Sequence, residues 1–191
     1  MTLEEISIKE AARYIGIRTA PDEQTAKLFE KYEKIVRSRL RPAYVYRETE
    51  IDFKKGFVVL SGMDVPLTGE SIQKLLEGCN RAVILGATVS AEADRLIRET
   101  SVVDMAAALV VDALCSAAIE QVCDRAEVEI FGDMPKNMRT YRFSPGYGDL
   151  PIELQKDWLN YLNAQRRIGL SCTDSYLLTP TKSVTAIIGI R

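Results

Sequence analysis

Residues 102–125 form a predicted helix that is apolar around most of its circumference, and this feature limits the folds open to the chain. Its apolar positions fall at nearly every helical angle: Val103, Met105, Ala106, Ala107, Leu109, Val110, Val111, Ala113, Leu114, Ala117, Ala118, Ile119 and Val122. A helix that is hydrophobic all round is buried against a sheet or against other helices. Because no uninterrupted run of about 18 apolar residues occurs, we expect a core helix and no transmembrane segment.

One row along this helix departs from the apolar pattern, at Asp104, Ala108, Asp112, Ser116, Glu120 and Asp124. A spacing of four places neighbouring members on one helical face. We expect most of the row to be a solvated edge. Asp112 lies among Val110, Val111, Ala113 and Leu114, so its carboxylate requires a cap, a cation or a ligand.

The rest of the chain alternates predicted helices with predicted strands. Helical spacing, caps and breakers predict short helices near 11–15 and 71–76 and longer ones over 22–40, 90–98 and 152–168. β-branched and aromatic runs predict strands over 43–49, 56–60, 81–89, 128–131, 170–178 and 183–190, with a hairpin turn at 54–56. Consecutive apolar residues at 186–188 predict a central strand covered on both faces. This mixture predicts an α+β fold with a mostly antiparallel, twisted sheet packed against helices, in one domain spanning residues 1–191.

Charge and the N-terminal sequence narrow the classes of function. The net charge is −2, which argues against a nucleic-acid-binding protein. The first residues, Met1 to Glu5, are acidic and lack the basic and apolar regions of a signal peptide. We therefore expect a cytoplasmic protein that binds neither nucleic acid nor a membrane.

The chain contains no histidine, and this excludes several kinds of chemistry. Ser-His and Cys-His nucleophiles and histidine-ligated metals are ruled out, and so is histidine ligation of a corrinoid cobalt. The four cysteines, Cys79, Cys115, Cys123 and Cys172, form no Cys-x-x-Cys pair. We expect them to be small apolar residues in a reducing compartment, and we expect no metal site.

Residues 142–151 combine one arginine with two glycines, two prolines and two aromatic residues. Proline fixes φ and glycine permits positive φ, so the backbone alternates stiff and permissive positions. A guanidinium beside glycines that allow close backbone approach is suited to a carboxylate or a phosphate. The alternative is that Arg142 is a structural arginine, paired with an acid beside a tight turn.

Three segments resemble the activation domain of cobalamin-dependent methionine synthase. Arg142, followed by Gly146 and Tyr147 and then a proline, is similar to the family's signature loop. The segment 170–176 is followed by Pro180 and by residues 183–186. Together they are similar to the family's closing segment, which consists of a Thr-acid-Ser turn, a proline and a Ser-Val strand. A weaker similarity is Asp112-Ala113-Leu114 on the long helix. The resemblance covers about residues 100–190.

The resemblance implies a role in methionine biosynthesis, as a stand-alone reactivation subunit. In that family, inactive cob(II)alamin is rescued by one electron and a methyl group from S-adenosylmethionine. The activation domain binds S-adenosylmethionine and has the α+β architecture predicted above. Cobalamin would then lie only on the partner, a corrinoid methyltransferase or a methionine synthase that lacks its own activation domain. A flavodoxin-type protein would donate the electron, and the chain itself would be an accessory subunit of a methyltransferase system.

Carried over by position, Arg142 would bind the methionyl carboxylate. Gly146 and Tyr147 would bring backbone groups to the ligand and close the pocket, and Phe143 and Ser144 would line it. Asp112 and Ser116 would complete the site from the long helix. Ser116 stands where the family has a glutamate, and this chain ends before the family's aromatic segment.

Two other functions stay open. One is a module of the same fold that docks on a corrinoid protein without binding S-adenosylmethionine. The other is a small-molecule methyltransferase, which predicts a parallel sheet and a glycine-rich first loop.

Overall fold

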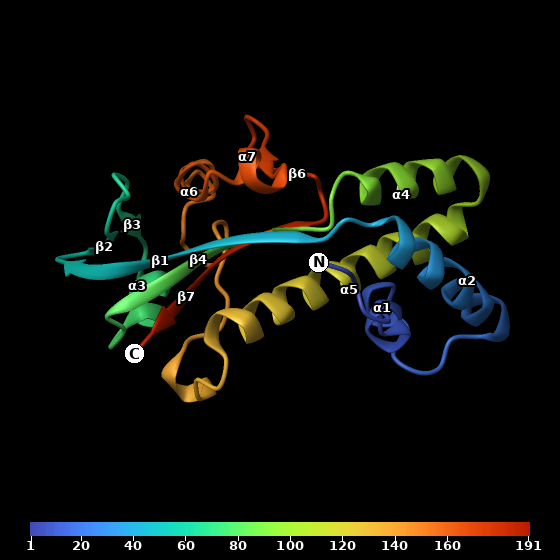
Figure 1. The fold of residues 1–191 in the computed structure, drawn as a ribbon, viewed down its shortest axis with the longest axis horizontal. Helices are drawn as coiled ribbons and strands as arrows, with labels where there is room; N and C mark the ends of the chain where they lie inside the picture. Colours follow the sequence, from blue (N-terminus) through green and yellow to red (C-terminus); the bar gives the residue numbers. More distant parts are fainter.

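The computed structural model describes all 191 residues and is built on one antiparallel sheet (Figure 1). The strand order is β3-β2-β1-β4-β7, and each strand is antiparallel to its neighbours. The strands are β1 (Ala43–Lys54), β2 (Phe57–Leu60), β3 (Leu67–Thr68), β4 (Arg81–Thr88) and β7 (Ser183–Ile190). The predicted hairpin between β1 and β2 is confirmed, and Gly56 occupies its turn at φ +90°. The α+β fold with a mostly antiparallel sheet is likewise confirmed.

Alternation along β4 divides the core between the two faces of the sheet. Ala82 and Ile84 belong to a cluster under α3 (Glu70–Leu76), α6 (Leu154–Leu162) and α7 (Ala164–Ile168). Val83 and Ala87 face the side of α5 (Met105–Phe131). Figure 1 shows α5 crossing one face of the sheet and α6 and α7 lying on the other.

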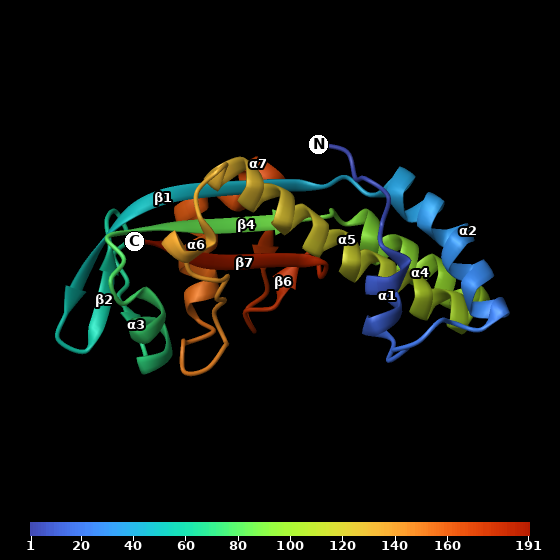
Figure 2. The same ribbon diagram turned by 90° about the horizontal axis from the view of Figure 1, so that it is seen from below.

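A helical lobe extends beyond one end of the sheet (Figure 2). The first half of α5 packs there against α1 (Ile8–Tyr14), α2 (Glu23–Arg39) and α4 (Glu92–Val103). Asp22 caps α2 as predicted, accepting a hydrogen bond from the backbone N–H of Thr25 at 2.9 Å. Arg39 joins α2 to α4 through Glu92 at 2.9 Å and Glu99 at 2.6 Å.

Helix α5 is the buried helix that the sequence predicts, and it is longer than expected. By length and composition it could cross a membrane, but 67% of its most apolar window is buried inside the protein, as in a core helix. Asp104 caps its start. The predicted strand at 128–131 is wrong, because the helix continues to Phe131, which packs against Val83 and two isoleucines of β7. Burial of Phe131 in the fold overrides the local β propensity.

Three other predictions need correction. The helix predicted over 152–168 is two helices, because Asn163 adopts a left-handed conformation at φ +51° between α6 and α7. The strand predicted over 170–178 is a turn between β5 (Ser171–Cys172) and β6 (Leu178–Thr179). Strand β7 is covered on both faces, as predicted, but it lies at the edge of the sheet, where Arg139 and Phe143 bridge to it.

Candidate ligand-binding site

The loop at 142–151 is fixed to the edge of the sheet by its own backbone. Phe143 exchanges two backbone hydrogen bonds with Ile187 of β7, at 3.0 and 2.8 Å. The N–H of Gly146 donates to the carbonyl of Leu150 at 2.9 Å, which closes a compact turn. Gly146 has φ +87°, and a Cβ there would lie 2.8 Å from Cδ1 of Ile152. The positive φ therefore favours glycine at this position, while a Cβ would require the end of the Ile152 side chain to shift.

Arg142 projects from this loop toward α5 and contacts three carboxylates. Its Nη2 lies 2.8 Å from Glu120 and 3.1 Å from Asp124, and its Nε lies 3.4 Å from Glu127. Its Nη1 is buried and has no hydrogen-bond acceptor in the protein. The arginine side chain is 22% exposed, so these contacts are partly desolvated. Glu120 and Asp124 are 44% and 72% exposed, so this part of the α5 row is a solvated edge that also pairs with Arg142.

A cavity of about 250 Å³ lies directly beside this ion cluster, between α1 and α5. Glu120 and Asp124 form part of its wall on α5, and Glu10 and Tyr14 contribute from α1. The pKa of Tyr14 is raised, first by burial and then by the charges of Glu120 and Glu10. Its wall thus carries several carboxylates, of which Glu10 pairs with Arg13 at 3.1 Å and Glu120 and Asp124 pair with Arg142.

The two other predicted positions on α5, Asp112 and Ser116, meet a lysine that sequence reasoning missed. Lys182 Nζ lies 2.9 Å from Asp112 Oδ1 and donates to Ser116 Oγ at 2.8 Å. Of the cap, the cation or the ligand expected for Asp112, the structure shows the cation. Lys182 is the only cation between residues 170 and 190, and this is the signal that could have found it. Lys182 and Arg142 therefore contact the same row of α5, one helical turn apart at Ser116 and Glu120.

The remaining loop residues lie on the other side of the sheet from Arg142. Phe143 is buried in the core under α3 and α6 and meets the ring of Tyr147 edge-on, with centroids 6.2 Å apart. Tyr147 is exposed, and Ser144 accepts a backbone hydrogen bond from it. The structure thus brings Arg142, Glu120 and the α1 residues together, while Phe143 and Tyr147 point elsewhere.

Asp149 ends the loop as a cap for α3. Its carboxylate accepts hydrogen bonds from the N–H groups of Glu70 at 2.6 Å and Ser71 at 3.0 Å. Hydrogen bonds from the side chain and backbone of Ser71, and then from Glu70, hold the pKa of Asp149 below its usual value. The cap therefore joins the loop to the far end of the sheet.

We expect Asp149→Asn to lower the melting temperature at neutral pH, because the amide is a weaker acceptor at a helix start. The wild-type carboxylate has a lower pKa folded than unfolded, so its contribution is present above the unfolded value of about 3.9 and is lost as the pH falls through the folded value. Thermal unfolding of both proteins from pH 7 to pH 2.5 should show the difference shrinking below about pH 4. A difference that is constant over this range would contradict the assignment.

The cysteines lie apart from any reactive site. All four are free thiols, and burial raises the pKa of Cys115 and of Cys123 to about 12. Both lie on α5 beneath the ion clusters, where a thiol with such a pKa is neutral at physiological pH. The expected role as small buried residues is confirmed for Cys79, Cys115 and Cys123, whereas Cys172 is only partly buried.

The fold, a curled antiparallel sheet with one long buried helix on its face, is similar to that of a solved structure, the MetH reactivation domain bound to AdoHcy, which matches with a TM-score of 0.71 over 88% of this chain. Sequence identity is 14%, and the chain spans 65% of the length of that structure, so the likeness establishes the fold. No protein-family model matches the chain, and no curated protein matches its sequence.

Proposed function

We propose that the chain is a stand-alone reactivation module of the cytoplasm that binds S-adenosylmethionine for a cobalamin-dependent methyltransferase. The supporting observation is that Arg142 contacts Glu120 and Asp124, which line the α1–α5 cavity, in a fold similar to that of a solved domain bound to AdoHcy. In this proposal Arg142 binds the ligand's carboxylate. The family has a glutamate on its long helix at the position that corresponds to Ser116 when residues are counted along the sequence. In this proposal Glu120 supplies that carboxylate instead.

Charge complementarity favours the methylated ligand. S-adenosylmethionine carries a sulfonium cation and an ammonium group in addition to its carboxylate, whereas AdoHcy lacks the sulfonium. Glu10, Glu120 and Asp124 line the cavity and attract positive charge. The chain's own task is to bind the methyl donor and orient its methyl group, while the redox and alkylation chemistry belongs to the partner's corrinoid.

Calorimetric titration with both ligands tests this assignment. We expect S-adenosylmethionine to bind about three- to tenfold more tightly than AdoHcy, as for a partly exposed charge pair. Glu120→Gln should reduce that ratio. The ratio of the two affinities reports on the sulfonium alone. Glu120→Gln also frees Arg142 from one ion pair, but that change affects both ligands equally. Glu30→Gln, at an exposed position of α2, is the matched control.

Two results would count against the proposal. The absence of heat with either ligand at millimolar concentration would show that the chain does not bind S-adenosylmethionine. Equal affinity of the wild type for the two ligands would show that the acidic wall does not bind the sulfonium.

The proposed partner is a corrinoid methyltransferase, or a methionine synthase without its own activation domain, with a flavodoxin-type electron donor. Reactivation and normal turnover alternate on the same cobalamin, so the association should be transient. Chemical cross-linking of the immobilised chain in cell extract should capture a corrinoid protein. Recovery of unrelated proteins alone would contradict the partner assignment.

One observation favours a second candidate, a docking module that does not bind S-adenosylmethionine. Arg142 already contacts three carboxylates, which is the arrangement expected of a structural arginine. A ligand carboxylate would have to replace Glu120 or Asp124 at Nη2. The third candidate, a small-molecule methyltransferase with a parallel sheet, is disfavoured because every strand pair is antiparallel.

A further inference from the structure

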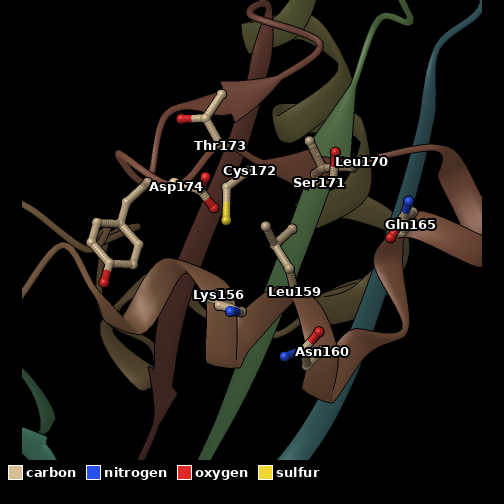
Figure 3. Close-up of a pocket in the computed structure, with 10 residues that line it drawn as sticks. Lys156, Leu159, Asn160, Gln165, Leu170, Ser171, Cys172, Thr173 and Asp174 are labelled. Atoms are coloured by element: carbon tan, nitrogen blue, oxygen red, sulfur yellow. The ribbon is translucent and has the colours of Figure 1, made fainter.

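A second cavity lies on the opposite face of the sheet from α5, between the α6–α7 pair and the β5–β6 hairpin (Figure 3). Its volume is about 250 Å³. Lys156, Leu159 and Asn160 form the wall from α6, and Cys172 and Asp174 face them from the hairpin. It shares no residue with the α1–α5 cavity, so it is a separate site.

The cavity carries two opposite charges that have no partner in the protein. Lys156 and Asp174 are on facing walls, both are exposed to solvent, and neither forms an ion pair or a side-chain hydrogen bond. Both charges act on the Cys172 thiol, since Lys156 lowers its pKa and Asp174 raises it, while burial raises it most. The thiol therefore lies between a free cation and a free anion and is itself neutral at physiological pH.

The floor between these charges is apolar. Leu159 is 6% exposed and Leu170 is fully buried, and the Cys172 sulfur points toward α6 beside Leu159 in Figure 3. The amide groups of Asn160 and Gln165 line the rim without a side-chain hydrogen bond. The lining is therefore mostly polar around a small apolar floor, which suits a small ligand that carries both polar and apolar groups.

The hairpin wall is held in place before any ligand arrives. The N–H of Thr173 donates to the carbonyl of Leu177 at 2.8 Å, and the Thr173 hydroxyl accepts from the N–H of Leu177 at 3.2 Å. Tyr176 completes the turn at φ +62°, a conformation that a non-glycine residue adopts only when its surroundings enforce it. Asp174 is therefore carried on a constrained loop, which reduces the entropy lost on binding.

We propose that this cavity binds a free α-amino acid with an unbranched apolar side chain. The carboxylate lies at Lys156, the ammonium lies at Asp174, and the side chain follows Leu159, Leu170 and the Cys172 sulfur. A ligand with only one charge would leave one of the two protein charges unpaired.

Three probes with the same carbon chain separate the contributions. L-norleucine carries both charges, hexanoate lacks the ammonium, and pentylamine lacks the carboxylate. In calorimetric titrations of the full chain, we expect norleucine to bind with one-to-one stoichiometry at millimolar concentration. The other two should bind at least about tenfold more weakly, which corresponds to ~1.4 kcal/mol per lost ion contact.

Two variants assign each charge to its ligand group. Lys156→Met should weaken norleucine binding about tenfold. It should also abolish the difference between norleucine and pentylamine, because the protein then offers no cation to the norleucine carboxylate. Asp174→Asn should abolish the difference between norleucine and hexanoate. Lys34→Met, at an exposed position of α2, is the matched control and should change nothing.

Three results would overturn the proposal. One is the absence of norleucine binding at concentrations up to about 20 mM. Another is norleucine binding that both variants leave unchanged. The third is hexanoate binding as tightly as norleucine, which would indicate a simple anion site. S-adenosylmethionine affinity should be the same in both variants, so the outcome is independent of the proposed function.

Discussion

Trp158→Ala is expected to cost about 3–5 kcal/mol in the free energy of unfolding, the range for removing a fully buried aromatic side chain. Trp158 is 0% exposed and lies in the cluster that joins α6 to the sheet, with Leu154 and Leu162 on the same helix. Domains of this size lose roughly 2–4 °C per kcal/mol, so the melting temperature should fall by about 6–20 °C.

Trp158→Phe is the informative companion. The indole Nε1 is buried, and no protein group accepts its hydrogen bond. Phenylalanine removes that unsatisfied donor and keeps most of the apolar ring, so the two changes oppose each other. We expect a cost below about 1.5 kcal/mol. Urea unfolding followed by circular dichroism measures both variants, and similar costs for alanine and phenylalanine would show that packing of the ring does not anchor α6.

The elements that sequence reasoning identified correctly are those specified by local chemistry. Asp22 caps α2 and Gly56 occupies the hairpin turn, and each acts on neighbours within four residues. The apolar circumference of α5 also predicted its burial, because a helix without a polar face has no stable position in water. These features needed no knowledge of distant parts of the chain.

The predictions that were wrong concern segments whose secondary structure depends on contacts with distant parts of the chain. Residues 128–131 have strand-like side chains, but Phe131 is buried against Val83 and Ile188, and Arg139 stacks on its ring at 4.7 Å. Asn163 breaks a helical pattern that continues through it, and only its tolerance of positive φ hinted at the break. A single-residue kink of this kind leaves the surrounding periodicity intact.

The candidate site follows the same division. The sequence singled out Arg142, the polar row on α5 and Asp112 as a carboxylate that requires a cap, a cation or a ligand. It did not pair Arg142 with Glu120, because the two lie 22 positions apart with no periodic relation between them. The contribution of Glu10 and Tyr14 from α1 was equally hidden, since more than a hundred residues separate them from α5's acidic wall. Acids and a cation were therefore recognised separately, but their arrangement required the fold.

The largest functional effect is expected at Arg142, where the two leading functions make opposite forecasts. If Arg142 binds the ligand carboxylate, Arg142→Ala removes one partner of a charge-assisted contact in a partly desolvated site, at a cost of ~2–5 kcal/mol. That is a factor of roughly 30 to several thousand in the dissociation constant of S-adenosylmethionine. Arg142→Lys should recover only part of it, because lysine cannot present the planar guanidinium fork.

If Arg142 is purely structural, the same substitution lowers the melting temperature and leaves affinity per folded molecule unchanged. Loss of stability is expected in either case, since Glu120, Asp124 and Glu127 lose their shared cation. Arg39→Ala is the matched control, because Arg39 also contacts two glutamates, at a distance from the cavity. Calorimetric titration below the melting temperature of each variant therefore decides between them: a change confined to Arg142 variants supports ligand binding, and unchanged affinity in Arg142→Ala leaves docking as the function of this fold.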